Sequence, residues 1–246
     1  MRGLLRLTWL EIKIFLREPL GAIGTLGVPV LVYLFLGRLF SRGRPVPESL
    51  PFMAYGIATL GGVMIAINAV LSLVTIVAIY RESGILKRLR ATPLRPSTIL
   101  VAHVLTKLLF TAVTFLLLAL AGRRFFPASM HIPLVSFTLA LLLSTWAILA
   151  LGFVIASVVS TARFAQPLAT LVLYPMLALS GLFYPIAALP PVWRALSRVM
   201  PITYVVSLLE GIMKGEGWQA HLTDVAALVI VFAVCIALSS KLFRWE

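Results

Sequence analysis

Long apolar stretches without charge alternate with short basic segments along most of the chain. Residues 19–37 carry no charged side chain, and neither do residues 49–80. A helix needs about 20 mostly apolar residues to cross a hydrocarbon core of about 30 Å. The pattern therefore predicts an all-α membrane protein with six transmembrane helices, at residues 19–37, 52–79, 99–121, 134–159, 167–183 and 222–240.

Lysine and arginine in the connecting segments predict the orientation of the chain, because cytoplasmic loops are enriched in both. With the N-terminus inside, 12 of these cations fall on the inner segments, which are residues 1–17, 80–98, 160–166 and 241–246. Eight fall on the longer outer segments, which are residues 38–51, 122–132 and 184–221. We therefore expect a multi-pass protein of the cell membrane with both termini in the cytoplasm.

The first segment, residues 1–17, is too charged to cross a membrane. At about 100° per residue its cations share one narrow arc, and most of the remaining circumference is apolar. This predicts a retained amphipathic helix in the membrane interface, with interfacial residues Arg2, Arg6, Trp9, Lys13 and Arg17. Glu11 falls on the apolar side of that helix. A simple anchor and a specific role in gating both remain open.

Composition excludes a soluble or a disordered chain. Hydrophobic residues make up 61% of the sequence and charged residues 12%, about half the charged fraction of a typical soluble domain. The net charge of +13 lies between apolar runs, where it favours contact with membrane lipids and not with nucleic acid. The single cysteine, Cys235, excludes a cysteine-based metal cluster, and we expect no metal or cofactor in this chain.

Two regions differ from plain transmembrane helices. In the basic loop of residues 81–96, we expect a short helix from Glu82 to Arg90, ended by Thr92-Pro93, with Glu82 beside an apolar face. A docking surface for a partner and a solvated loop are both open interpretations. In the second region, Pro185, Pro190, Pro191 and Pro201 break the chain into pieces that are too short to cross a membrane.

The second region predicts a pair of short helices that dip into the outer leaflet and return, because non-helical backbone at membrane depth must be buried in protein or face water. We expect one piece at residues 191–200 and the other at residues 203–213. Together with the flanking turn, this hairpin covers residues 184–213.

The order of the predicted helices and two motifs resemble the permease subunit of ABC-2 type transporters. The motifs are Arg-Glu-Ser-Gly-Ile-Leu-Lys-Arg-Leu-Arg-Ala-Thr-Pro at residues 81–93 and Leu-Ser-Gly-Leu-Phe-Tyr-Pro at residues 179–185, followed by Pro-Ile-Thr-Tyr at residues 201–204. The resemblance covers essentially the whole chain, residues 1–246, as one transmembrane permease domain.

The resemblance implies that the loop at residues 80–98 docks on a separate ATPase. The ATPase-coupling residues would be Glu82, Gly84, Ile85, Leu86, Leu89, Thr92 and Pro93. It also implies two ATPase subunits, which bind ATP and Mg, and a second permease that is either a copy of this chain or a homologue. The sequence itself has no phosphate loop ending in Gly-Lys-Ser/Thr, so another polypeptide must supply the energy.

Polar residues inside the predicted helices are candidates for a substrate path. Asn68, Ser72 and Thr75 share one face by their i, i+4, i+7 spacing, and Thr170, Tyr174 and Ser180 belong to the fifth helix. Hydrogen bonding between helices is the alternative role. The glycines at Gly24, Gly27, Gly61 and Gly62 favour close helix packing over a binding site.

These features indicate an exporter of a hydrophobic or amphiphilic substrate, drug-like or lipid, that works by alternating access and is not itself an enzyme. Export of a lipid-linked polysaccharide or glycolipid is the alternative within the same class. An intramembrane enzyme and a non-transporting assembly protein are alternatives of other classes. The enzyme is disfavoured because Asp224 is the only aspartate and the histidines fall near the ends of different helices.

Overall fold

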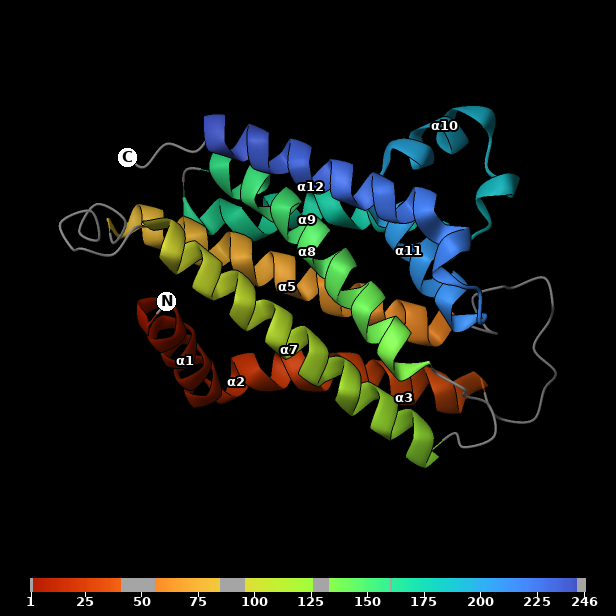
Figure 1. The fold of residues 1–246 in the computed structure, drawn as a ribbon, viewed down its shortest axis with the longest axis horizontal. Helices are drawn as coiled ribbons and strands as arrows, with labels where there is room; N and C mark the ends of the chain where they lie inside the picture. Colours follow the sequence, from red (N-terminus) through yellow and green to blue (C-terminus); the bar gives the residue numbers. More distant parts are fainter. Residues whose placement is uncertain (1, 41–55, 85–95, 126–132, 160, 243–246) are drawn as a thin grey trace.

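A computed structural model describes residues 2–40, 56–84, 96–125, 133–159 and 161–242. Every regular element in these residues is helical, and none of them forms a strand, as the sequence predicts (Figure 1). The elements in chain order are α1 (Arg2–Arg17), α2 (Pro19–Ala22), the π-helix η1 (Ile23–Gly27), α3 (Val28–Phe40), α5 (Gly56–Glu82), α7 (Pro96–Phe125), α8 (Leu134–Val158), α9 (Ala162–Ala178), η2 (Ile186–Ala188), α10 (Pro191–Val199), α11 (Pro201–Met213), η3 (Trp218–His221) and α12 (Leu222–Leu242).

Four helices among the described residues are each long and apolar enough to cross a membrane. They correspond to four of the predicted spans, and they contain residues 59–82, 101–121, 134–158 and 218–241. Two further pairs of helices reach that standard only when the two helices of each pair are taken together, and both pairs are sharply bent. The bend is 95° between α1 and the α2–α3 segment, and 83° between α10 and α11. The described chain thus has four to six candidate spans.

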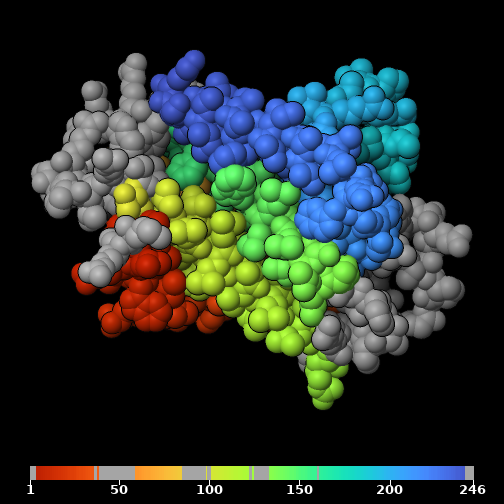
Figure 2. Space-filling view, viewed as in Figure 1, coloured from red at the N-terminus to blue at the C-terminus, as the bar shows by residue number. Residues whose placement is uncertain are grey.

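The centre of the bundle is built by α5 and α8. Val70, Leu73 and Val74 on α5 are fully buried, and a β-carbon at Gly152 on α8 would lie 2.9 Å from the Cγ1 of Val70. A residue without a side chain at this point lets the two backbones approach closely, as is common between membrane helices. The long helix α12 packs on α8 and leaves most of its own surface facing outward (Figure 2).

The helix α9 differs from the predicted fifth span in both of its ends. It runs over Ala162–Ala178, 17 residues, where the sequence pattern predicted residues 167–183. Pro167 and Pro175 lie inside the helix, which shows that a proline did not mark its start. Beyond the C-cap Leu179, the chain turns at Gly181, which has a φ of +90°, a left-handed conformation that glycine adopts readily.

The predicted pair of short helices after α9 corresponds to α10 and α11. Side chains of α11 close the junction between them: the Thr203 hydroxyl donates to the Ser197 carbonyl at 2.6 Å, and the Tyr204 hydroxyl donates to the Arg198 carbonyl at 2.6 Å. These carbonyls are at the end of α10, where a helix leaves acceptors unpaired. The junction is therefore a bonded corner.

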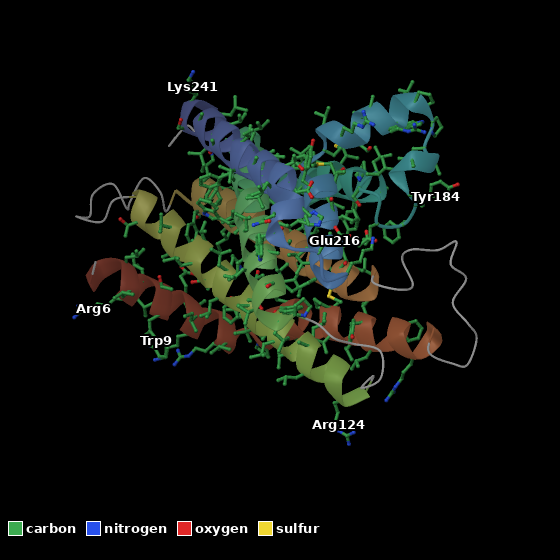
Figure 3. The ribbon with its side chains drawn as sticks, turned by 45° about the vertical axis from the view of Figure 1, so that its right-hand side comes forward. Arg6, Trp9, Arg124, Tyr184, Glu216 and Lys241 are labelled. Carbon is green, nitrogen blue, oxygen red and sulfur yellow. The ribbon has the colours of Figure 1, made fainter. Side chains whose placement is uncertain are left out.

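The predicted N-terminal helix is confirmed as α1, which lies along α7. Arg6 and Trp9 point away from the bundle (Figure 3), and Lys13 and Arg17 are also exposed. Leu4, Leu7 and Phe15 are part-buried. The cationic side of α1 therefore faces outward and part of its apolar side packs on the bundle, while Leu5, Leu10 and Leu16 remain exposed.

The start of the expected coupling helix needs a correction. Glu82 is the last residue of α5 and does not begin a new helix. The helix ends there because Gly84 has a φ of +68°, which turns the chain away from the axis of α5. Ile85, Leu86, Leu89, Thr92 and Pro93 lie outside the described residues, and so does the rest of the expected helix.

Candidate functional site

A cavity of about 650 Å³ lies between the N-terminal elements and the centre of the bundle. Its lining residues come from α1, α2, η1, α3, α5, α7 and α9. The volume falls within the range of about 300–1,000 Å³ that is typical of sites for small organic ligands. The cavity is the candidate functional site of the chain.

The polar face that the sequence predicts on α5 lines this cavity. Asn68, Ser72 and Thr75 are all lining residues, and all three are part-buried. The hydroxyls of Ser72 and Thr75 donate to the carbonyls of Ala69 and Leu71, at 3.2 and 2.8 Å, within α5 itself. In the described part of the chain these two hydroxyls make no hydrogen bond to a second helix, so their oxygens keep acceptor capacity toward the cavity.

The N-terminal elements provide an unusual backbone wall. Gly21 and Gly24 line the cavity, and Gly24 lies in the π-helix η1. A β-carbon at Gly24 would meet nothing within 4 Å, so the prediction that this glycine serves close packing is wrong. The same prediction is confirmed for Gly61, where a β-carbon would collide with the Leu118 side chain. Short π-helical turns often occur at functional sites.

A cluster of ionisable side chains lies at the α1–α7 side of the cavity. The Glu11 carboxylate on α1 is 3.2 Å from Nδ1 of His103 on α7. The Tyr80 hydroxyl on α5 lies 3.4 Å from the other Glu11 oxygen and 3.2 Å from Nε2 of His103. Lys107, one turn beyond His103, lies over the Phe15 ring with its ammonium 5.5 Å from the ring centre.

This cluster fastens the amphipathic helix to the bundle through polar as well as apolar contacts. Burial raises the pKa of the Glu11 carboxyl, while the positive charge of Lys107 and the hydrogen bond from Tyr80 act against that rise in pKa. The Phe15 ring adds an apolar contact, because its centre lies 4.1 Å from that of Phe110 on α7. The sequence signals for this cluster were Glu11 on the apolar side of α1 and the polar residues His103 and Lys107 inside an apolar stretch, but nothing in the sequence joined them, because Tyr80 and His103 lie about 70 to 90 residues away from Glu11.

At the end of α5, Arg81 and Glu82 hold the turn between α8 and α9. The Arg81 guanidinium donates to the carbonyls of Ser157 and Val159, at 3.2 and 3.0 Å, where α8 ends. The Glu82 carboxylate accepts a hydrogen bond of 2.7 Å from the backbone N–H of Ala162, where α9 begins. A cation at a helix C-terminus and an anion at a helix N-terminus both suit the helix dipole. We call this pair the α5 clamp.

The remaining predicted path residues do not line the cavity. Thr170 and Tyr174 follow the lining residue Gln166 at spacings of four along α9, and the Tyr174 side chain is half-exposed. Ser180 is buried beyond the end of α9 and donates to the Leu177 carbonyl at 2.6 Å. The structure therefore brings together the three candidates on α5 but not those on α9 and beyond it.

A second polar cluster joins α11 to α12. Both ring nitrogens of His221 contact carboxylates, with Nδ1 at 2.8 Å from Asp224 and Nε2 at 2.9 Å from Glu216. Asp224 also accepts a hydrogen bond of 2.8 Å from the Ser207 hydroxyl. His221 does not contact Ser207 as a general base would, since the aspartate lies between them. No group of three or more histidine, cysteine or acidic residues in the described ranges is arranged to hold a metal ion.

Comparison with known proteins assigns the chain to a class of membrane transport proteins. Its sequence matches the model of the ABC-2 type transporter family over residues 2–214. The chain belongs to the ABC-2 type transporter family and is a multi-pass permease of ABC transporters.

Individual relatives agree with this family. The chain is 30% identical over 211 residues to ABC transporter G family member 20 of Dictyostelium discoideum, a match that covers 81% of this chain and 28% of that protein. It is 29% identical over 192 residues to the inner membrane transport permease YhhJ of Escherichia coli, a match that covers 73% of this chain and 51% of that protein. Nodulation protein J of Rhizobium leguminosarum is 35% identical over 75 residues, 30% of this chain and 29% of that protein. The chain spans about half or less of the length of these curated relatives.

Proposed function

We propose that the chain is the membrane subunit of an ATP-driven exporter that takes a hydrophobic or amphiphilic small molecule into the cavity described above. The observation that carries this proposal is the cavity itself, whose lining combines the polar face of Asn68, Ser72 and Thr75 with apolar side chains such as Ile14 and Val28. Such a surface suits a ligand that is apolar over most of its area and polar at one end. Its volume favours a drug-sized molecule over a lipid-linked polysaccharide.

In this proposal the chain crosses the membrane six times with both termini in the cytoplasm. The four long helices cross the membrane, and the α2–α3 segment and α9 make the other two crossings. The helices α10 and α11 form a re-entrant hairpin on the outer side. The bias of lysine and arginine toward the inner segments supports this orientation. The N-terminal end of α1 and the C-terminal end of α12 also lie at the same end of the bundle (Figure 1).

Cysteine labelling tests this topology in a Cys235→Ser background. Ser83 and Val192 are both exposed, at the end of α5 and on α10 respectively. A cysteine at position 83 should react only with a reagent that reaches the cytoplasm, and one at position 192 only with an impermeant external reagent. Labelling of both from one side would refute the six-span topology.

The energy source in this proposal is a pair of separate ATPase subunits that bind ATP and Mg, joined to two permeases through the loop after α5. The family supports a partner ATPase in general, and the loop motif at residues 81–93 supports this position for the contact. ATP-driven closure of the ATPases would switch the permease pair between inward and outward access. Purification of the tagged chain in mild detergent should recover a stoichiometric ATPase, and its absence would contradict the proposal.

Ligand binding by the cavity is tested with matched threonines. Thr75 and Thr138 each donate a hydroxyl to a carbonyl four residues earlier in their own helix, and Thr75 lines the cavity whereas Thr138 does not. A neutral fluorescent amphiphile, N-phenyl-1-naphthylamine, serves as the probe with the purified complex in lipid nanodiscs. Thr75→Val should weaken its binding a few-fold, and Thr138→Val should leave it unchanged. Equal affinities in both variants would exclude the cavity as the site.

A further inference from the structure

The charged side chains of the cavity do not balance. Two of the lining residues are glutamates, Glu11 and Glu18, and one is a lysine, Lys107. The remaining ionisable lining residue is His103, which pairs with Glu11 at 3.2 Å. If the two glutamates and the lysine are charged and the histidine is neutral, the lining carries one more negative charge than positive charge.

Lys107 is the one lysine or arginine among the residues that line the cavity. Both Glu11 and Glu18 attract its ammonium group, and the Phe15 ring lies beneath it at 5.5 Å. A carboxylate or phosphate that approached Lys107 would have to approach two glutamates as well. An anionic head is therefore disfavoured at this side of the cavity.

Glu18 is the second carboxylate of the lining, which has only one lysine for its two glutamates. Among the described residues it forms no ion pair, whereas Glu11 contacts His103 and Tyr80. Its side chain is exposed and lies beside Gly21, where a β-carbon would be 3.7 Å from the Glu18 Oε2 atom. The missing side chain at Gly21 leaves room for a ligand group next to this oxygen.

The polar face on α5 is also suited to a cationic head. The Asn68 side-chain carbonyl and the hydroxyl oxygens of Ser72 and Thr75 are acceptors. The two hydroxyl protons are already directed to carbonyls of α5. An ammonium donor thus finds acceptors on this wall of the cavity.

We propose that the cavity selects amphiphiles with a cationic head, and that the Glu18 carboxylate determines this preference. The inference rests on the proposed function, because it names the substrate class of the same cavity. The head lies between Glu18 and the acceptors on α5, and the apolar part of the ligand contacts the side chains of Ile14, Val28 and Ile76.

A pair of probes of matched shape tests the charge preference. Tetraphenylphosphonium and tetraphenylborate have nearly the same size and opposite charges, and N-phenyl-1-naphthylamine is the neutral reference. Binding to the purified complex in nanodiscs of neutral lipid is measured by equilibrium dialysis for the two ions and by fluorescence for the neutral probe. Protein-free nanodiscs correct for partition of each probe into the lipid.

Three variants locate the charge that is responsible. Glu18→Gln should weaken tetraphenylphosphonium binding roughly five- to tenfold, the effect of one partly solvated charge pair, and leave the neutral probe unchanged. Glu18→Lys should weaken binding of the cation further and strengthen binding of tetraphenylborate. The control Glu210→Gln removes a glutamate that pairs with Lys214 at 2.8 Å outside the cavity, and it should change neither ion.

The outcomes separate the inference from the proposed function. Binding of the neutral probe together with equal affinity for both ions, or a preference for the borate, would overturn the cation preference and leave the exporter proposal intact. An unchanged phosphonium affinity in Glu18→Gln would also overturn it. Failure of all three probes to bind the wild-type complex would contradict the proposed function itself.

Discussion

The two polar clusters of this permease lie at opposite ends of the bundle and differ in how completely their hydrogen bonds are formed. The cluster at the α11–α12 junction is tight, since both nitrogens of His221 contact carboxylates within 2.9 Å. The cluster at the α1–α7 contact is looser, since the contacts among Glu11, Tyr80 and His103 measure 3.2 to 3.4 Å. Only the looser cluster adjoins the cavity.

This difference indicates a division of roles between the two ends. A fully bonded buried network makes one arrangement rigid, because any rearrangement leaves a polar group without a partner. A network with long contacts beside an open space loses less when it rearranges. We therefore expect changes at the α11–α12 junction to destabilise the whole fold. Changes at the α1–α7 contact should weaken the attachment of α1 to α7 and alter transport.

The largest expected effect comes from Gly211→Ala in the tight cluster. A β-carbon at this position of α11 would overlap the Nε2 atom of His221, and the ring is held from both sides by Glu216 and Asp224. Relief of the overlap should cost about 2–4 kcal/mol of folding free energy, as for overpacking combined with a broken buried network. Thermal unfolding of the purified protein in detergent should show a clearly lower Tm.

Gly217→Ala is the matched control for this prediction. Gly217 precedes the same junction, has a φ of −73°, and offers open space to a β-carbon. Its substitution should leave the Tm within about one degree of the wild-type value, because nothing is displaced. If both glycine variants unfold at the wild-type temperature, the tight cluster is not the rigid element that the comparison requires.

The next effect concerns the looser cluster and the substitution Glu11→Leu. The change removes the acceptor that His103 and Tyr80 share, and it leaves these groups without their shared partner. We expect a cost of about 1–3 kcal/mol that is confined to the attachment of α1 to α7. Hydrogen exchange should become faster at the amides of residues 4–17 and stay unchanged in α12.

A conservative variant distinguishes hydrogen bonding from charge at this position. Glu11→Gln keeps an acceptor oxygen for Tyr80, so it should restore most of the protection in α1. Equal loss of protection in α12 and α1 for Glu11→Leu would mean that this cluster also stabilises the whole fold, and the contrast between the two ends would fail.

Local patterns in the sequence predict much of this architecture. The long apolar stretches locate α5, α7, α8 and α12, because each is defined by consecutive residues. The four prolines between residues 185 and 201 locate the broken pair α10 and α11 for the same reason. Helical spacing also places Asn68, Ser72 and Thr75 on one face, and the structure confirms that they share a cavity.

The sequence alone does not show which distant residues contact each other. Glu11 is an unexplained carboxylate until α1 lies against α7, and its partner His103 is 92 residues away. Glu216, His221 and Asp224 are close in sequence, but their spacing alone did not predict that both ring nitrogens of His221 contact carboxylates. The end of α9 was missed because the uncharged stretch of the sequence continues beyond it to Phe183.

The smallest expected effect on stability comes from the α5 clamp, and it decides between two roles of Glu82. Sequence reasoning assigns this carboxylate to docking of the ATPase, whereas the structure pairs it with the backbone N–H of Ala162. Loss of such a cap costs about 1 kcal/mol. Glu82→Ala should therefore lower the Tm by only about 2–4 °C but reduce transport per ATP hydrolysed several-fold, since α9 no longer follows the end of α5.

Recovery of the ATPase separates the two roles, because only docking places Glu82 in the contact with the partner. If the clamp is the main role, Glu82→Ala co-purifies with a normal amount of ATPase, and Glu82→Gln, which keeps an oxygen for the Ala162 N–H, recovers most of the coupling. If docking is the main role, both variants lose the ATPase to a similar extent. Normal coupling in Glu82→Ala would remove both roles of Glu82, and Arg81, which donates to the carbonyls of Ser157 and Val159, would be the next residue of the α5 clamp to test.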